Sequence, residues 1–217
     1  MPELVLYNYW RSSSSHRVRI ALALKALAYR YVAVDLLRGE QSSEAYADRS
    51  PTKYVPCLSI DGVLYSESVA IIELLDDRFP SPGLYPRDAH HRARVRSLVE
   101  IVNSGIQPLQ NRQVLQRVSD DSEAQVAWAA HFNERGLHAF ERAMEANARA
   151  GVSGRFAYGD EVSAADVFLV PQVQAAVRFG VDLSSLPRVR SAFDAASRLD
   201  AVMQAAPERQ PDAPKSP

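Results

Sequence analysis

The order of apolar segments in the first eighty residues is the strongest constraint on the fold. Residues 4–7 form a short apolar run typical of a buried strand, and residues 17–25 are rich in helix formers. Residues 31–34 predict a second strand. This order forms a βαβ unit, whose two strands lie parallel and are joined by a right-handed crossover.

A predicted hairpin and a helix follow after a polar loop. Asp61-Gly62 separates the apolar runs 57–60 and 63–65, and this dipeptide favours a two-residue hairpin turn. Ser66-Glu67-Ser68 then begins a helix that stops before Pro80. The resulting βαβ-ββα order predicts a thioredoxin-like domain with a mixed four-stranded sheet.

Strand signals vanish from residue 89 onward, so the rest of the chain is predicted to be a helical bundle. Ser163 and Asp166 have the spacing of a capping box at the start of a buried helix. Other helices are indicated by apolar positions at helical spacing: Val95, Leu98, Val99, Val102 and Ile106; Trp128, Phe132, Leu137, Phe140 and Met144; and Val189, Phe193 and Val202. We therefore expect an α/β domain at 1–83, an all-helical domain at 89–206 and a proline-rich flexible tail at 207–217.

Composition excludes several classes of function. The 217 residues carry 25 Lys+Arg and 26 Asp+Glu, so net charge gives no reason to bind nucleic acid or an anionic membrane. The single cysteine, Cys57, excludes an internal disulfide, a redox Cys-x-x-Cys and a cysteine-rich zinc site, and we expect no metal. No apolar stretch reaches about 20 residues and no leader is evident, so a soluble cytoplasmic protein is expected.

Two predicted helix starts carry serine hydroxyls, namely Ser12–Ser15 at the first and Ser66 and Ser68 at the second. A helix N-terminus stabilises an anion through its backbone N–H groups and its dipole. Two such ends can hold a thiolate and a carboxylate, and because Cys57 lies in the sheet the thiolate must arrive with a cofactor. That describes glutathione. The simpler interpretation of the serine run is a loop with an N-cap.

A resemblance to a known family makes the serine run more specific. Residues 11–22, beginning Arg11-Ser12-Ser13-Ser14-Ser15-His16, resemble the start of the first helix in zeta-class glutathione transferases, the family that contains maleylacetoacetate and maleylpyruvate isomerases. Further matches lie at residues 55–56, 67–73, 105–111, 159–167, 170–173 and 178–179. The resemblance covers about residues 4–211, and it implies the two-domain glutathione transferase fold and, usually, a homodimer.

The resemblance assigns catalytic roles to the first serines. Ser12 stands where the family has its thiolate-stabilising serine, with Ser13 beside it. Ser14 replaces the family's cysteine, and a hydroxyl still donates to a thiolate, so glutathione activation is expected without chemistry that needs a protein thiol. His16 replaces a frequent tryptophan and is expected to be a structural or gating neighbour rather than a base.

The resemblance also implies a set of glutathione contacts. Val55-Pro56 matches a cis-proline turn that pairs with the cysteinyl part, and Glu67-Ser68 matches the position that holds the γ-glutamyl end. The further contacts that it implies are Gln41, Gln107 and Asn111. Two alternatives stay open: Gln41 as ordinary loop polarity, and Asn111 as a cap on backbone freed by Pro108.

The activity that the resemblance implies is glutathione-dependent cis–trans isomerisation of maleyl-keto acids, by thiolate addition, bond rotation and elimination. The substrate is a dianion, and arginine grips carboxylates in a bidentate manner. We expect Arg11, Arg112 and Arg178 to bind it, against the common alternative of surface ion pairs.

Maleylacetoacetate, from tyrosine breakdown, is the first choice of substrate, and maleylpyruvate, from gentisate breakdown, is the second. Two further classes are weighed against them: a general transferase that acts on electrophiles or α-halo acids, and a glutathione-binding protein without turnover. An apolar electrophile gains nothing from the arginines, and Ser12 argues against the non-catalytic alternative.

Overall fold

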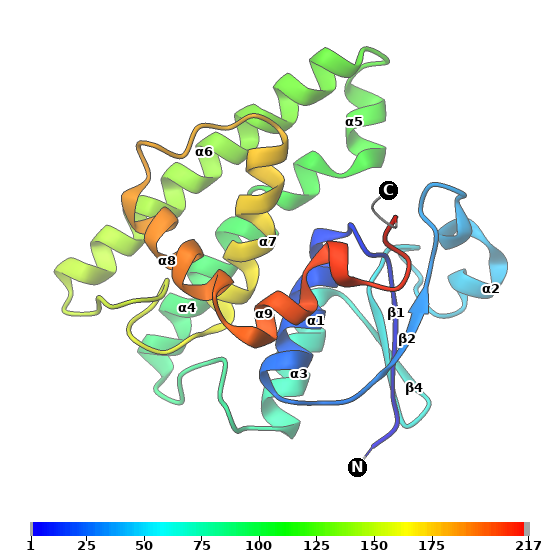
Figure 1. Ribbon diagram of the computed structural model, residues 1–217, viewed down its shortest axis with the longest axis horizontal. Coiled ribbons are helices and arrows are strands. Elements are labelled where there is room, and N and C mark those ends of the chain that lie inside the picture. The colour runs from blue at the N-terminus through cyan, green and yellow to red at the C-terminus, as the bar shows by residue number, and fades with distance from the viewer. Residues whose placement is uncertain (1, 215–217) are drawn as a thin grey trace. The chain divides into compact units, whose positions relative to one another are not determined.

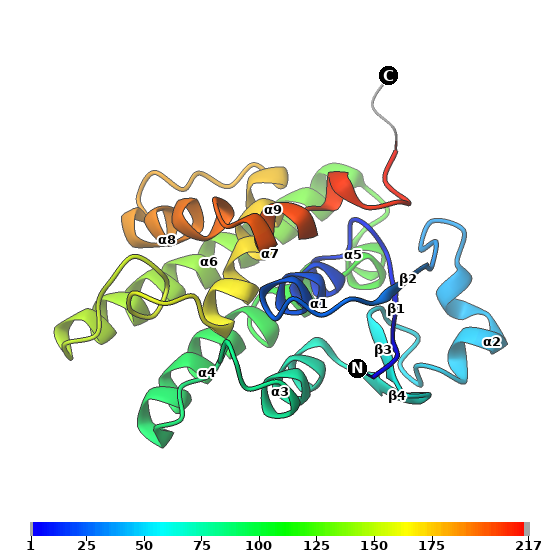
Figure 2. The ribbon, with the colours of Figure 1, turned by 60° about the horizontal axis from the view of Figure 1, so that its bottom comes forward.

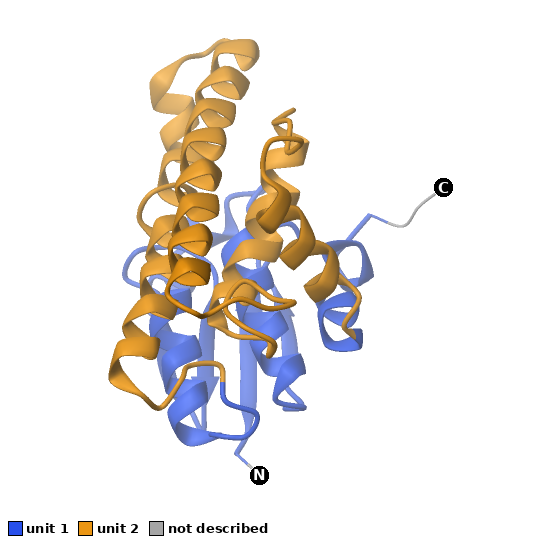
Figure 3. Cartoon of the chain, turned by 90° about the vertical axis from the view of Figure 1, so that its left-hand side faces the viewer, with its two compact units in different colours: residues 1–83, 200–217 blue, residues 84–199 orange. Residues whose placement is uncertain are grey.

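The computed structural model describes residues 2–214 and contains two compact units. The first unit comprises residues 1–83 and 200–217, and the second comprises residues 84–199 (Figure 3). Each unit has its own set of buried apolar side chains, and the two are described separately.

The first unit is built on a mixed sheet. In chain order it contains β1 (Leu4–Asn8), α1 (Ser13–Leu24), β2 (Arg30–Ala33), β3 (Cys57–Ile60), β4 (Val63–Ser66) and α3 (Ser68–Arg78) (Figure 1). Within residues 2–214 the sheet has four strands in the order β2-β1-β3-β4, with β1 parallel to β2 and the other pairs antiparallel. The predicted βαβ-ββα arrangement is confirmed.

The connection from β2 to β3 has more structure than the polar loop expected there. It contains a 3-10 helix, η1 (Glu40–Ser42), and one short helical turn, α2 (Glu44–Ala47). Ser43 begins α2 by accepting a hydrogen bond from the Tyr46 N–H, while the buried Tyr46 donates its hydroxyl to the Tyr54 carbonyl. These bonds shape the chain just before Val55.

The C-terminal segment belongs to the first unit. Helix α9 (Asp200–Ala205) and the 3-10 helix η3 (Pro207–Arg209) follow each other, and α9 packs on α1 (Figures 1 and 2). The Gln210 amide then donates to the carbonyls of Gln204 and Ala206. Residues 200–214 therefore group with the first unit, whereas residues 200–206 were expected at the end of the helical domain; residues 215–217 of the predicted flexible tail lie outside the described residues.

The second unit is helical throughout its described elements. These are α4 (Ala89–Asn103), η2 (Gln107–Gln110), α5 (Arg112–Val118), α6 (Ser122–Arg149), α7 (Ala164–Arg178) and α8 (Pro187–Ser197). Its core is formed by apolar side chains at helical spacing, among them Val95, Leu98, Val102, Leu137, Phe140, Phe168 and Val173. The predicted capping box is present: Ser163 caps α7, and the buried Asp166 accepts from the N–H groups of Ser163 and Ala157. Burial raises the pKa of Asp166 to about 6.

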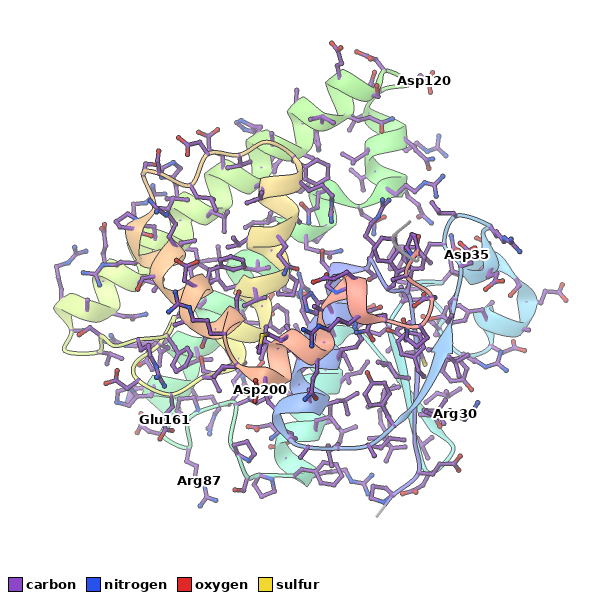
Figure 4. All side chains as sticks on the ribbon, in the orientation of Figure 1. Arg30, Asp35, Arg87, Asp120, Glu161 and Asp200 are labelled. Atoms are coloured by element: carbon purple, nitrogen blue, oxygen red, sulfur yellow. The ribbon has the colours of Figure 1, made fainter. Side chains whose placement is uncertain are left out.

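Charged side chains of both signs lie on the surface, for example Arg30 and Asp200 in the first unit and Arg87, Asp120 and Glu161 in the second (Figure 4). Within residues 2–214, no helix combines the length and apolar character needed to cross a bilayer. The same residues contain no group of three or more His, Cys, Asp or Glu arranged to hold a metal ion.

Candidate active site

The start of α1 presents the first predicted serine as a helix cap. Ser12 has an extended backbone, its Oγ accepts from the Ser15 N–H at 3.2 Å, and its carbonyl accepts from the His16 N–H at 2.9 Å. The hydroxyl cap satisfies the N–H of Ser15, the first helical hydrogen bond takes that of His16, and within the described residues the N–H groups of Ser13 and Ser14 are the open donors of the helix end. A serine hydroxyl both accepts and donates, so the Ser12 O–H proton stays available to an anion.

The start of α3 is built differently. Glu67, the residue before the helix, has φ 68° and ψ 117°, in a region that a residue with a side chain rarely adopts. Within the described residues no side chain caps this helix end, so the N–H groups of its first turn are open donors. Ser68 is the first helical residue and is buried, whereas Glu67 is exposed.

Strand register brings these two helix starts to one edge of the sheet. Cys57 pairs with Tyr7 on β1 and with Ser66 on β4, so Pro56 lies beside the ends of both strands that lead into the helices. The Val55–Pro56 peptide bond is cis, as the resemblance implies. Val55 also shares a small buried hydrophobic cluster with Tyr9, Val34 and Tyr46. The predicted residues Ser12, Val55, Pro56, Glu67 and Ser68 therefore occupy one region of the first unit.

Two buried arginines of α1 support this region, and sequence analysis missed both. The first is Arg17, whose Nη1 donates to Ser68 Oγ at 3.3 Å and so ties α1 to the start of α3. The second is Arg19, which donates to three backbone carbonyls, of Tyr9 at 3.3 Å, Trp10 at 2.9 Å and Ala205 at 3.1 Å. Both side chains are fully buried, and burial lowers the pKa of Arg19. The available signal was that both arginines flank Val18 and precede the apolar run at residues 20–24 of the helix.

Gln41 lies on η1 and is half-buried. Its Oε1 atom is buried and accepts no hydrogen bond within residues 2–214. A buried acceptor without a donor is costly unless a ligand or water supplies one. The open N–H groups of α3, the Ser12 hydroxyl and this amide oxygen are together a donor and acceptor set that fits a peptide carrying a carboxylate and a thiol, such as glutathione.

The chain's own thiol is not suited to nucleophilic chemistry. Cys57 is buried in β3, its Sγ donates to the Arg49 carbonyl at 3.2 Å, and burial raises its pKa to about 11. A thiol with a raised pKa carries little thiolate at neutral pH. Likewise, His16 is buried and desolvation lowers its pKa to about 3, so it is neutral at neutral pH.

The remaining predicted residues are distributed as follows. Arg11 is exposed, with its guanidinium carbon 5.8 Å from the centroid of the Trp10 ring. In the second unit, Arg112 and Arg178 are exposed at the start of α5 and the end of α7. Asn111 caps α5 by accepting from the Gln113 N–H at 3.2 Å, and Gln107 is half-buried on η2.

A buried amide network holds η2 in the second unit. Asn133 Nδ2 on α6 donates to Gln110 Oε1 at 2.6 Å, and Gln172 Nε2 on α7 donates to Asn133 Oδ1 at 2.6 Å. Asn133 and Gln172 are fully buried. Because Gln110 immediately precedes Asn111 and Arg112, this network fixes the start of α5 within the unit. Sequence analysis did not identify it.

Comparison with known proteins agrees with the fold. Residues 6–83 match the glutathione S-transferase N-terminal domain family. Rat maleylacetoacetate isomerase is 44% identical over 212 residues, covering 97% of this chain and 95% of that protein. A maleylpyruvate isomerase described as a bacterial zeta-class glutathione S-transferase is 41% identical and superposes with a TM-score of 0.92, over 97% of this chain and 100% of that one.

A third relative carries bound molecules. Maleylacetoacetate isomerase from Anaeromyxobacter dehalogenans, with glutathione bound in its active site, is 46% identical with a TM-score of 0.88, over 98% of this chain and 99% of that one. The same protein is also known with dicarboxyethyl glutathione and citrate in its active site.

The fold and the match over residues 6–83 define the class as glutathione transferases. Sequence identity of 41–46% to the three isomerases, over nearly the whole chain, identifies the family within this class. The chain belongs to the zeta-class family of glutathione transferases and maleylacetoacetate isomerases.

Proposed function

We propose that this protein is a glutathione-dependent isomerase that converts maleyl-keto acids to their fumaryl isomers, with maleylacetoacetate as its first substrate. The observation that carries the proposal is the pair of helix starts, one capped by Ser12 and one open before Ser68, at one edge of the sheet. It is supported by the isomerase relatives at 41–46% identity.

The first unit is the glutathione-binding part in this proposal. The open N–H groups at the start of α3, with Ser68 and Glu67, hold the γ-glutamyl end, while the backbone at Val55 and Pro56 pairs with the cysteinyl part. Gln41 offers its unpartnered amide oxygen to a glutathione N–H. Gln107 and Asn111 are proposed as further contacts from the second unit.

When bound, glutathione supplies a thiolate whose addition to the maleyl double bond, and later elimination, permits rotation about that bond. The chain's part is to keep the sulfur ionised. The Ser12 hydroxyl donates to it, and the N–H groups and hydroxyls of Ser13 and Ser14 add donors at the positive end of α1. Because Cys57 is buried and protonated, the protein's own thiol does not compete.

The substrate has two carboxylates, and we propose that Arg11, Arg112 and Arg178 bind them. The second unit is accordingly the substrate-binding part, with Arg112 at the start of α5 and Arg178 at the end of α7. Cationic donors near the keto group also stabilise the negative charge that develops on its oxygen, as an oxyanion hole does.

Maleylpyruvate is the second candidate substrate, because a relative of 41% identity with a TM-score of 0.92 is a maleylpyruvate isomerase. Its shorter skeleton carries the same two anionic ends. A broader transferase activity toward electrophiles shares the thiolate and differs only in having no use for the arginines. We further propose that the protein works in the cytoplasm as a homodimer and takes part in the breakdown of aromatic compounds.

The test measures glutathione-dependent loss of the cis acid by absorbance, separately with maleylacetoacetate and maleylpyruvate. Replacing Arg178 with alanine removes a charge-assisted contact to a carboxylate, so we expect KM to rise about tenfold to a hundredfold. Arg149→Ala is the matched control, because Arg149 is also an exposed arginine in the last turn of a helix of the second unit.

Turnover of either acid, weakened by Arg178→Ala and not by Arg149→Ala, supports the isomerase, and the ratio of the two kcat/KM values names the substrate. Glutathione binding without turnover of either acid would overturn the isomerase proposal in favour of a general transferase.

A further inference from the structure

We propose that Asp212, close to the C-terminus, is a positioning residue that fixes the loop carrying Ser12. One carboxylate oxygen, Oδ2, accepts from the backbone N–H of Trp10 at 3.0 Å, and the other, Oδ1, accepts from the Tyr31 hydroxyl. These contacts join residues that are 202 and 181 positions apart in sequence. The inference rests on the proposed function, because it concerns the geometry of the proposed thiolate donor.

The loop between β1 and α1 is held on both sides of Trp10. Asp212 accepts a hydrogen bond from the N–H of Trp10, and Arg19 Nη2 donates to the carbonyl of Trp10 at 2.9 Å. Arg19 Nη1 also donates to the Tyr9 carbonyl at 3.3 Å. The Ser12 N–H then donates back to the Tyr9 carbonyl at 3.1 Å, which closes the turn. A shift of Trp10 therefore moves Ser12, two residues further on.

The segment that brings Asp212 to this loop is itself anchored. The buried amide of Gln210 donates to the carbonyls of Ala206 at 2.8 Å and Gln204 at 3.1 Å, and the Ala213 N–H donates to the Gln210 carbonyl at 3.0 Å. Further back, the Ala205 carbonyl accepts from Arg19 Nε at 3.1 Å. Arg19 thus holds both the serine loop and the end of α9.

Charge also favours this arrangement. Arg19 is fully buried, and burial lowers its pKa, whereas the nearby carboxylates of Asp212 and Glu208 favour its charged form. Burial, together with the hydrogen bond to Asp212, raises the pKa of Tyr31, so its hydroxyl remains a donor to the carboxylate. The carboxylate is therefore matched to a backbone donor, a hydroxyl donor and a nearby buried cation.

The experiment compares full-length Asp212→Ala and Asp212→Asn with Asp77→Ala, which removes the same charge from an exposed side chain of the first unit, near the end of α3. Three quantities are measured: amide hydrogen exchange at residues 9–12, the pKa of the thiol of bound glutathione from its ultraviolet absorbance, and kcat and KM for the cis acid. Asp212→Ala is expected to speed exchange about tenfold, raise the bound thiol pKa and lower kcat about tenfold, because small misplacement of a catalytic group is costly.

KM for the acid is expected to change less than kcat, since Asp212 acts through Ser12. Asp212→Asn keeps an acceptor oxygen and should recover part of the loss, whereas Asp77→Ala should match the wild type. Unchanged exchange in Asp212→Ala, or faster exchange with unchanged kcat and thiol pKa, would overturn the positioning role. If the wild-type protein neither ionises glutathione nor turns over the acid, the proposed function fails instead, and the positioning role falls with it.

Discussion

The two helix starts of the first unit differ in how the backbone N–H groups of their first turn are capped. Helix α1 begins with its own hydroxyl cap, Ser12, on an ordinary extended backbone. Helix α3 begins after Glu67, whose φ of 68° costs energy, and no side chain within the described residues caps it. One end carries a hydroxyl cap that takes the N–H of Ser15, and the other has no side-chain cap on the N–H groups of its first turn.

This difference matches two tasks. A thiolate carries its negative charge on one sulfur atom, so it needs a hydrogen-bond donor directed at that atom. The hydroxyl of Ser12, on a loop held in place by hydrogen bonds, provides such a donor. A carboxylate that only has to be held is well served by several open N–H groups at the positive end of a helix. The comparison therefore predicts that damage to α1 lowers kcat, while damage to α3 weakens glutathione binding.

The largest effect is expected from Ser12→Ala. The variant loses the donor to the thiolate, and by analogy with the loss of an oxyanion-hole donor kcat should fall by about 10²–10³. The measurement is kcat for the cis acid at saturating glutathione, together with the pKa of the bound thiol, which should rise toward that of free glutathione.

Ser43→Ala is the matched control for Ser12→Ala. Ser43 caps α2 by accepting from the Tyr46 N–H, so its loss costs a similar ~1 kcal/mol of stability without removing a thiolate donor. Equal loss of kcat in both variants would show that Ser12 acts only as a cap. Unchanged turnover in Ser12→Ala would remove Ser12 from the mechanism altogether.

A second prediction concerns acid stability and sharpens the account of α1. His16 lies in the first turns of this helix, and desolvation by burial lowers its pKa to about 3, so α1 offers an anion no imidazolium charge at neutral pH. Below pH 6.5 the unfolded chain takes up a proton that the folded chain does not. The contribution of neutral His16 to the free energy of unfolding is thus fully present above that pH. It is lost at about 1.4 kcal/mol per pH unit as the pH falls toward 3.

His16→Phe should flatten this part of the pH profile in urea unfolding followed between about pH 7 and pH 5, because phenylalanine does not titrate. His131→Phe is the control, since His131 is exposed on α6. An equally steep profile in His16→Phe would mean that other groups cause the acid sensitivity.

Sequence reasoning was most effective where structure depends on neighbours in the chain. Asp61 and Gly62 both have positive φ in the predicted hairpin, and Ser163 and Asp166 form the predicted capping box. The meeting of Ser12, Pro56 and Ser68 follows from strand register once the βαβ-ββα order is known. These features are local or topological, so patterns of apolar and turn residues suffice to predict them.

The missed features depend on partners far away in sequence. Arg17 and Arg19 are fully buried and serve as supports, whereas the arginines considered from sequence were the exposed ones. The contact of Asp212 with Trp10 and the amide network around Asn133 join separate segments, and no periodicity signals a hydrogen bond across 202 positions. The proline-rich end predicted mobility, and within residues 207–214 the side chains of Gln210 and Asp212 make hydrogen bonds that composition does not indicate.

The smallest effect is expected at the other helix start. Ser68→Ala removes one hydroxyl from the carboxylate site but leaves the open N–H groups of α3, so the Kd of glutathione should rise about tenfold, or about 1.4 kcal/mol, with kcat at saturation retained. Calorimetric titration with glutathione measures it, and Ser59→Ala, a buried serine in the middle of β3, is the control. A loss of kcat with unchanged Kd would contradict the division of tasks, because it would place thiolate stabilisation at α3. Since Ser68 Oγ also accepts from Arg17, an unfolding measurement on the same variant separates lost binding from lost stability.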